Sequence, residues 1–125
     1  MGTNLLMVAL GGAGGSILRY LCQKWINEAW IHSFPLATLL VNVSGCLLIG
    51  VFYGLGTRTD AFTPQVRLLL VTGFCGGFTT FSTFAFENMH LLRTADYLNL
   101  LAYTVLSVVA GVAAVFLGSW MVKLI

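Results

Sequence analysis

Four apolar stretches, each long enough to cross a lipid bilayer, account for most of this 125-residue chain. A helix that crosses the hydrocarbon core needs about 20 mostly apolar residues. The predicted spans are residues 4–22, 35–56, 64–92 and a last one that follows a cap at Thr94 or Asp96 and ends near residue 122. We therefore expect an all-α integral membrane protein with four transmembrane helices, folded as a single domain over residues 1–125.

The composition leaves little room for a catalytic domain. Hydrophobic residues make up 58% of the chain and charged residues 8%, whereas a soluble domain has about 25% charged residues. The formal net charge of +2 is too small to indicate a nucleic-acid partner. His32 and His90 have neither a nucleophile partner nor metal-ligand spacing. These features predict a multi-pass protein surrounded by lipid and not an enzyme.

The third span contains an unusual run of glycines and hydroxyl side chains. It reads Gly73-Phe-Cys-Gly-Gly-Phe-Thr-Thr-Phe-Ser-Thr-Phe84, and its three glycines predict a break in the helix at Gly73–Gly77. A broken helix at membrane depth survives only inside protein or along a cavity, because hydrocarbon leaves its backbone groups without partners. We expect an ion or substrate path here, and the freed carbonyls are also suited to holding a cation.

The loops carry no signal that would orient the chain in the membrane. Cytoplasmic loops normally hold an excess of Lys and Arg, whereas three basic residues lie on each side of the predicted spans. They are Arg58, Arg67 and Lys123 on the terminal side, and Arg19, Lys24 and Arg93 on the other. Either another feature sets one orientation, or copies insert both ways. Opposed copies can pair about a two-fold axis in the membrane plane.

Pairs of small residues spaced by four also bear on association. Four helices are too few to surround a sizeable pore, and small residues let helices approach closely in lipid. The pairs are Gly11/Gly15, Gly50/Gly54, Gly73/Gly77 and Ala114/Gly118. They serve either association between copies or packing within one subunit.

Several polar and aromatic side chains are predicted at membrane depth on spans 2 and 3. Asn42 either donates to an anion or makes an interhelical hydrogen bond, since a carboxamide there needs a partner or water. Phe81 and Phe84 lie about one turn apart, and the electropositive edge of a phenyl ring can face an anion. Glu87 extends the same stripe as either a vestibule residue or an interfacial carboxylate.

Other polar groups have equally open alternatives. Tyr103 and Ser107 share a face of the fourth span and can continue a polar track, although a serine hydroxyl also bonds readily to its own backbone. Arg19, at the end of the first span, either snorkels to the interface or neutralises an anion pathway.

Taken together, these segments resemble the CrcB/Fluc family of small fluoride channels over essentially the whole chain. The resemblance rests on three motifs, of which the third is highly specific. They are Gly11-Gly-Ala-Gly-Gly-Ser-Ile-Leu-Arg19-Tyr20, Thr38-Leu-Leu-Val-Asn42-Val-Ser-Gly45 and Gly73-Phe-Cys-Gly-Gly-Phe-Thr-Thr-Phe-Ser-Thr-Phe84.

The resemblance implies a dual-topology homodimer of antiparallel subunits in the bacterial cytoplasmic (inner) membrane, with two pores that carry fluoride passively out of the cell. The pore residues that it implies are Asn42, Phe81, Phe84, Thr80, Thr83, Tyr103, Ser107 and Arg19. It also implies a central structural Na⁺ held by the backbone carbonyls of Gly76 and Thr79 from both subunits. Departures from the family pattern occur at Ala37, Cys46 and Phe78, none of them an implied pore residue.

Three other functions remain open from the residues alone. A proton-coupled drug exporter needs a carboxylate deep in a span, and the only candidate, Glu87, lies near a helix end. A non-transporting subunit of a larger complex would show no ion flux as a bare homodimer. A fluoride/proton exchanger would move protons in a fixed ratio to fluoride.

Overall fold

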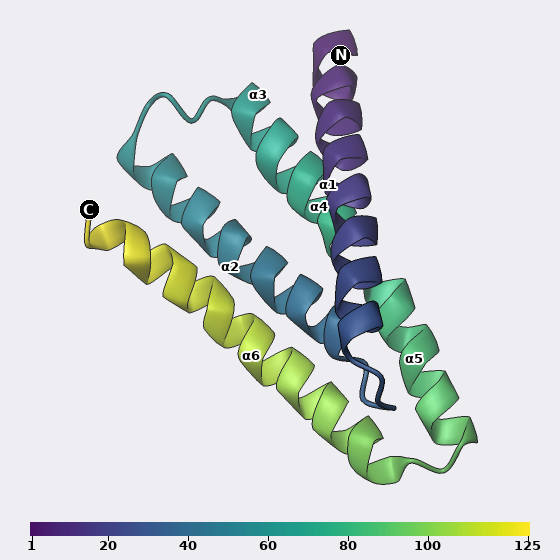
Figure 1. Ribbon diagram of the computed structural model, residues 1–125. Helices are drawn as coiled ribbons and strands as arrows, with labels where there is room; N and C mark the ends of the chain where they lie inside the picture. Colours follow the sequence, from purple (N-terminus) through teal and green to yellow (C-terminus); the bar gives the residue numbers. More distant parts are fainter.

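The computed structural model describes all residues 1–125 and consists of helices joined by short connections (Figure 1). Four helical segments are long and apolar enough to cross a membrane, which confirms the prediction of four spans. They are α1 (Gly2–Ala29), α2 (Leu36–Arg58), the composite segment Pro64–Arg93 and α6 (Tyr97–Lys123). The protein is thus a multi-pass, all-helical membrane protein.

The third span is built from four pieces. They are α3 (Pro64–Arg67), the π-helical η1 (Leu68–Cys75), α4 (Gly76–Phe78) and α5 (Phe81–Arg93). The span begins at Thr63, whose hydroxyl accepts a hydrogen bond from the Val66 amide at 3.2 Å. Pro64 occupies the first helical position, where its missing N–H is not needed.

The break in this span begins two residues beyond the end of the predicted position. Gly73–Gly77 stay helical, whereas Thr79 and Thr80 are extended, with φ/ψ of −83°/156° and −149°/113°. The prediction of a break at Gly73–Gly77 is therefore wrong in position, although the helix is interrupted. The glycines serve close packing instead, and the threonines have side-chain hydroxyls that can replace lost helical bonds.

Glycines bring the spans into backbone contact within the subunit. A Cβ added at Gly11 or Gly15 of α1 would lie 2.1 Å from a carbonyl oxygen of η1. In the pair α2–α6, a Cβ at Gly50 or Gly118 would lie 2.1 or 2.3 Å from a carbonyl of the facing helix. Helices in lipid associate through such close packing. The small-residue pairs on these helices therefore pack within one subunit, the second of the two alternatives.

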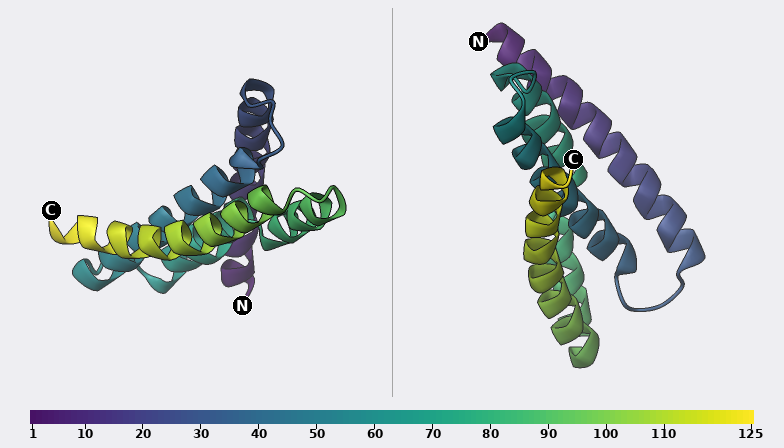
Figure 2. Two further views of the ribbon diagram at one scale, coloured as in Figure 1. Left: turned by 90° about the horizontal axis from the view of Figure 1, so that it is seen from below. Right: turned by 90° about the vertical axis from the view of Figure 1, so that its left-hand side faces the viewer.

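The spans form two packed pairs. Figure 1 shows α2 and α6 side by side, with α1 lying against the first half of the third span. The views in Figure 2 show α1 crossing the α2–α6 pair at an angle, and α5 continuing beyond the break toward the turn that joins it to α6. The break thus lies where the two pairs meet.

Much of the apolar surface remains uncovered in one copy of the chain. Only 17 of 125 residues are buried, and large side chains such as Phe81 and Phe116 are 78% and 72% exposed. Because the spans are long enough to cross a bilayer, these surfaces are available to lipid or to another protein surface.

Neighbouring glycines on α1 offer a matched test of the packing. We expect Gly15→Ala to destabilise the protein by about 1–3 kcal/mol, because its Cβ would enter the Phe74 carbonyl. Gly14→Ala should be neutral or stabilising by up to about 1 kcal/mol, because its nearest contact is an ordinary 3.9 Å and alanine favours helix. Thermal unfolding in detergent, followed by tryptophan fluorescence, measures both; equal effects would contradict the packing argument.

Candidate ion-conducting site

Asn42 on α2 holds the break in the third span. Its Nδ2 donates to the Thr80 carbonyl at 3.1 Å, and its Oδ1 accepts from the Thr80 N–H at 2.8 Å. One carboxamide therefore satisfies both backbone groups of the residue at which the helix is interrupted, as a neighbouring strand would. The interhelical hydrogen bond predicted as one alternative for Asn42 is present, and a second Nδ2 hydrogen remains available, because an amide has two donors.

Thr80 also begins the following helix. Its hydroxyl accepts from the Thr83 N–H at 3.2 Å, which makes it the N-cap of α5, and it donates to the Thr83 hydroxyl at 3.0 Å. A threonine cap satisfies one of the orphan amides at a helix start and typically contributes about 1 kcal/mol. Thr80 and Thr83 are thus joined in a short chain of hydroxyl groups.

Two carbonyls at the break lose their usual helical donors. The N–H of Thr80, four residues after Gly76, donates to Asn42 instead of to the Gly76 carbonyl. The N–H of Thr83, four residues after Thr79, likewise donates to the Thr80 hydroxyl. These are the two residues whose carbonyls the family resemblance implies as Na⁺ ligands.

Arg19 bonds to the backbone beside the break. Its Nε donates to the Gly77 carbonyl at 3.1 Å, on the α4 segment just before the break. In an unbroken helix, the Gly77 carbonyl would accept a hydrogen bond from the N–H of Phe81, four residues later. Arg19 therefore replaces another helical donor, and its guanidinium charge lies beside the break.

A cavity of about 280 Å³ opens next to the break. Five of the eight pore residues suggested by the sequence contribute to its wall: Asn42, Thr80, Phe81, Phe84 and Ser107. No lining residue is charged. The structure thus brings an amide, hydroxyl groups and two phenyl rings from α2, the third span and α6 to one small space.

The aromatic rings form a continuous group beside the cavity. The ring centroids of Phe81 and Phe84 are 5.7 Å apart, and those of Phe84 and Tyr103 are 5.0 Å apart with an interplanar angle of 53°. Such tilted arrangements direct the electropositive edge of one ring toward its neighbour. Phe84 therefore connects Phe81, which is largely exposed, with the fully buried Tyr103.

The two hydroxyls on α6 differ in their partners. The Tyr103 hydroxyl donates to Glu87 Oε1 at 2.8 Å, which joins α6 to α5. The Ser107 hydroxyl is buried and has no hydrogen-bond partner, so the backbone bond considered as its alternative is not made. A buried polar group without a partner is costly and calls for a ligand, a water molecule or an ion.

Besides Thr79, whose carbonyl was suggested as a Na⁺ ligand, three wall residues were not among the suggested pore residues: Cys46, Ile49 and Val108. Cys46 and Ile49 follow Asn42 by four and seven positions and therefore share its helix face. Val108 follows Ser107 directly on α6. The helical repeat from Asn42 would have identified the first two, since it places them in line with a residue already assigned to the path.

The comparisons with known proteins cover the chain almost from end to end. The family model described as "CrcB-like protein, Camphor Resistance (CrcB)" matches residues 6–119. The chain belongs to this CrcB family. A relative from Leptospira interrogans, named fluoride-specific ion channel FluC, is 48% identical over 96% of this chain and 94% of its own length. Relatives of the same name from Phocaeicola vulgatus and Gloeothece citriformis are 47% and 44% identical over 94% and 96% of this chain, and 97% of their own lengths.

These CrcB relatives confirm the resemblance read from the three sequence motifs. They are named as ion channels and not as enzymes, which agrees with the absence of a catalytic constellation in the sequence. The match spans α1 through most of α6, so all eight suggested pore residues and both carbonyl positions fall inside it.

Removing the Asn42 carboxamide tests its part in this CrcB-family fold. We expect Asn42→Ala to lower stability by about 1–3 kcal/mol for each Thr80 backbone group left unpaired. Amide hydrogen exchange over residues 78–84 should rise in the same variant. Ser44→Ala, an exposed position on the same helix, is the control and should change neither quantity. Unchanged exchange in Asn42→Ala would contradict its role at the break.

Proposed function

We propose that this protein is a fluoride-selective channel that passively exports fluoride from the cytoplasm and so relieves fluoride toxicity. The observation that carries the proposal is the uncharged cavity at the helix break, lined by an amide, hydroxyls and phenyl rings. The names of relatives at 44–48% identity over nearly the full chain support fluoride as the ion.

The chemistry of the cavity suits a small, tightly hydrated anion. Fluoride sheds water only if close donors replace it, and a channel must bind an ion well enough to admit it and weakly enough to release it. The free Nδ2 hydrogen of Asn42, the unpartnered Ser107 hydroxyl and the ring edges of Phe81 and Phe84 are the available donors. No Lys or Arg lines the cavity, so no full positive charge would trap the ion there.

The remaining suggested residues extend this path on either side. Thr80 and Thr83 supply linked hydroxyls. Tyr103 continues the track behind Phe84, with its hydroxyl held by Glu87. Arg19 contributes a positive charge beside the break, which favours entry of an anion.

We further propose an antiparallel homodimer with two pores, to which both subunits contribute. Phe81 lines the cavity yet is 78% exposed in a single copy, so this wall is open on one side. An opposed second copy would cover it. Equal numbers of basic residues on the two sides of the membrane agree with insertion in both orientations.

A structural Na⁺ at the dimer centre is part of the proposal. The Gly76 and Thr79 carbonyls fit this ion, because the donors that would normally occupy them are bound to Asn42 and Thr80. Oxygen dipoles of an unwound helix coordinate Na⁺ in other membrane proteins. Two copies meeting at their breaks would offer four such carbonyls, and the bound ion would tie the subunits together.

The cellular location follows from the same function. The relatives named above come from bacteria, and the four spans are helical. We therefore place the protein in the bacterial cytoplasmic (inner) membrane.

Fluoride flux from liposomes tests the channel directly. We expect protein reconstituted with potassium fluoride to release fluoride rapidly when valinomycin is added, and to release no chloride from a matched potassium chloride preparation. Phe81→Ile should slow release about tenfold, the effect of losing roughly 1.4 kcal/mol of interaction with the ion. Phe86→Ile, an exposed phenylalanine on the same helix and outside the cavity wall, is the control.

Other outcomes of this experiment favour other mechanisms. Fluoride release that needs no valinomycin and moves protons in a fixed ratio would indicate fluoride/proton exchange. Absence of any fluoride release from folded dimers would refute transport of this ion, and drug-stimulated proton flux would then be measured.

Sodium dependence of the dimer tests the carbonyl site. We expect the melting temperature and dimer fraction to rise with sodium chloride and not with choline chloride at equal ionic strength, because a ligand that binds only the native state stabilises it. Thr79→Ala removes the hydroxyl but keeps the carbonyl, and should retain the response. Identical behaviour in both salts would contradict a Na⁺ site.

A further inference from the structure

A second polar pocket lies away from the helix break, at the end of the molecule where the first and third spans begin. Its volume is about 460 Å³, and its polar wall consists of Asn4, Gln65, Arg67 and Thr72. Phe62, from the α2–α3 connection, forms part of its apolar wall. It shares no lining residue with the cavity at the break, so the proposed conduction path does not account for it.

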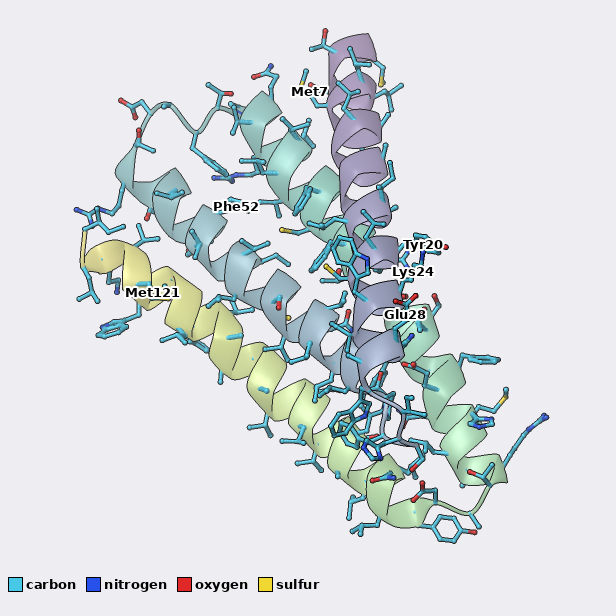
Figure 3. The ribbon with its side chains drawn as sticks, in the orientation of Figure 1. Met7, Tyr20, Lys24, Glu28, Phe52 and Met121 are labelled. Carbon is cyan, nitrogen blue, oxygen red and sulfur yellow. The ribbon has the colours of Figure 1, made fainter.

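The Arg67 guanidinium is held in place at this pocket. Its Cζ lies 5.9 Å from the centroid of the Phe62 ring, in the range of a cation–π interaction. Phe62 stacks in turn on Phe52, with centroids 6.3 Å apart and an interplanar angle of 29°; Figure 3 shows Phe52 on the side of α2 that faces α3. On the α2 side, a Cβ added at Gly56 would lie 2.9 Å from Arg67 Nη2. The guanidinium therefore fits a space that α2 and the aromatic pair have formed.

The wall offers donors and one positive charge but no negative one. Asn4 and Gln65 contribute carboxamides, Thr72 contributes a hydroxyl, and none of the seven lining residues is acidic. A planar guanidinium matches the oxygens of a phosphate with two parallel hydrogen bonds. The pocket thus suits an anionic ligand with several oxygen atoms.

The position of the pocket corresponds to the membrane boundary. Asn4 lies in the first turn of α1 and Pro64 starts the third span. The residues that follow Asn4, Leu5 and Leu6, are 62% and 53% exposed, as expected of side chains that face lipid. In a bilayer, the pocket would therefore open near the boundary between headgroups and acyl chains.

The charge balance at this end of the molecule favours the same ligand. Three basic residues (Arg58, Arg67 and Lys123) lie there with a single acidic residue, Asp60. Basic residues near a membrane surface are attracted to anionic lipids by about 1 kcal/mol each.

We propose that this pocket binds the headgroup phosphodiester of an anionic phospholipid. Arg67 takes the phosphate oxygens, the carboxamides of Asn4 and Gln65 bond to the phosphate or glycerol oxygens, and Phe62 contacts the glycerol carbons. The proposal is independent of fluoride conduction, because no residue of the candidate pore takes part.

Native mass spectrometry of the detergent-solubilised protein, titrated with dioleoylphosphatidylglycerol or dioleoylphosphatidylcholine, tests the site. We expect the anionic lipid to bind preferentially. Arg67→Gln should weaken that binding about tenfold or more, the factor for losing a hydrogen bond between charged groups. Arg67→Lys, which keeps the charge without the planar fork, should weaken it less. Arg93→Gln, an exposed arginine at the opposite end, is the matched control.

Three results would overturn the proposal. Equal loss in Arg93→Gln would mean that surface charge alone attracts the lipid. Equal binding of the two lipids by the unmodified protein would exclude headgroup recognition. Competition by millimolar inorganic phosphate, with no lipid retained, would identify a free-anion site. Should Arg67→Gln fail to fold, Asn4→Leu at the exposed rim serves instead, with reduced phosphatidylglycerol binding expected and unchanged binding contradicting the proposal.

Discussion

The pairing of the Asn42 carboxamide with the Thr80 backbone is the interaction on which the rest of this structure depends. Hydrocarbon offers no partner to a free N–H or C=O, so a helix can be interrupted at membrane depth only where protein supplies the missing bonds. Asn42 supplies two, and the Thr80 hydroxyl and the Arg19 guanidinium supply two more. The interruption then leaves carbonyls free on one side and a cavity with donor groups on the other.

Glycine contacts fix the position of that interruption. Gly11 and Gly15 of α1 allow the backbone of the third span to approach within contact distance, which anchors the span up to α4. On the other side, Gly50 and Gly118 hold α2 against α6. Asn42 is therefore presented at a fixed depth beside Thr80, and Ser107 is presented from the facing helix. Close helix packing and hydrogen bonding of the interrupted backbone are separate requirements, yet both act on the part of the third span around the break.

The sequence predicted the number and approximate bounds of the spans, because uninterrupted apolar length is a strong signal. It also singled out polar and aromatic residues at membrane depth, five of which line one cavity. The position of the break was not predicted correctly because glycine occurs both where a helix breaks and where two helices pack closely, and the local sequence does not separate these roles. The contact of Gly73 with Gly11 of α1 shows that close packing is its role here. The two hydrogen bonds between Asn42 and Thr80 join residues that are 38 positions apart. No local sequence pattern specifies such a contact. Cys46 and Ile49 were overlooked although they repeat the helical face of Asn42.

The buried Ser107 hydroxyl, which has no partner, has a consequence for how charge is tolerated in the cavity. A hydroxyl bound to a fixed acceptor must break that bond before it can turn toward an arriving charge. An unbound hydroxyl rotates about a single torsion, presenting its hydrogen to an anion and its lone pairs to a water molecule. On the proposed fluoride path, Ser107 would therefore act as a reorientable dipole, which could turn toward an ion without first breaking a hydrogen bond to the protein.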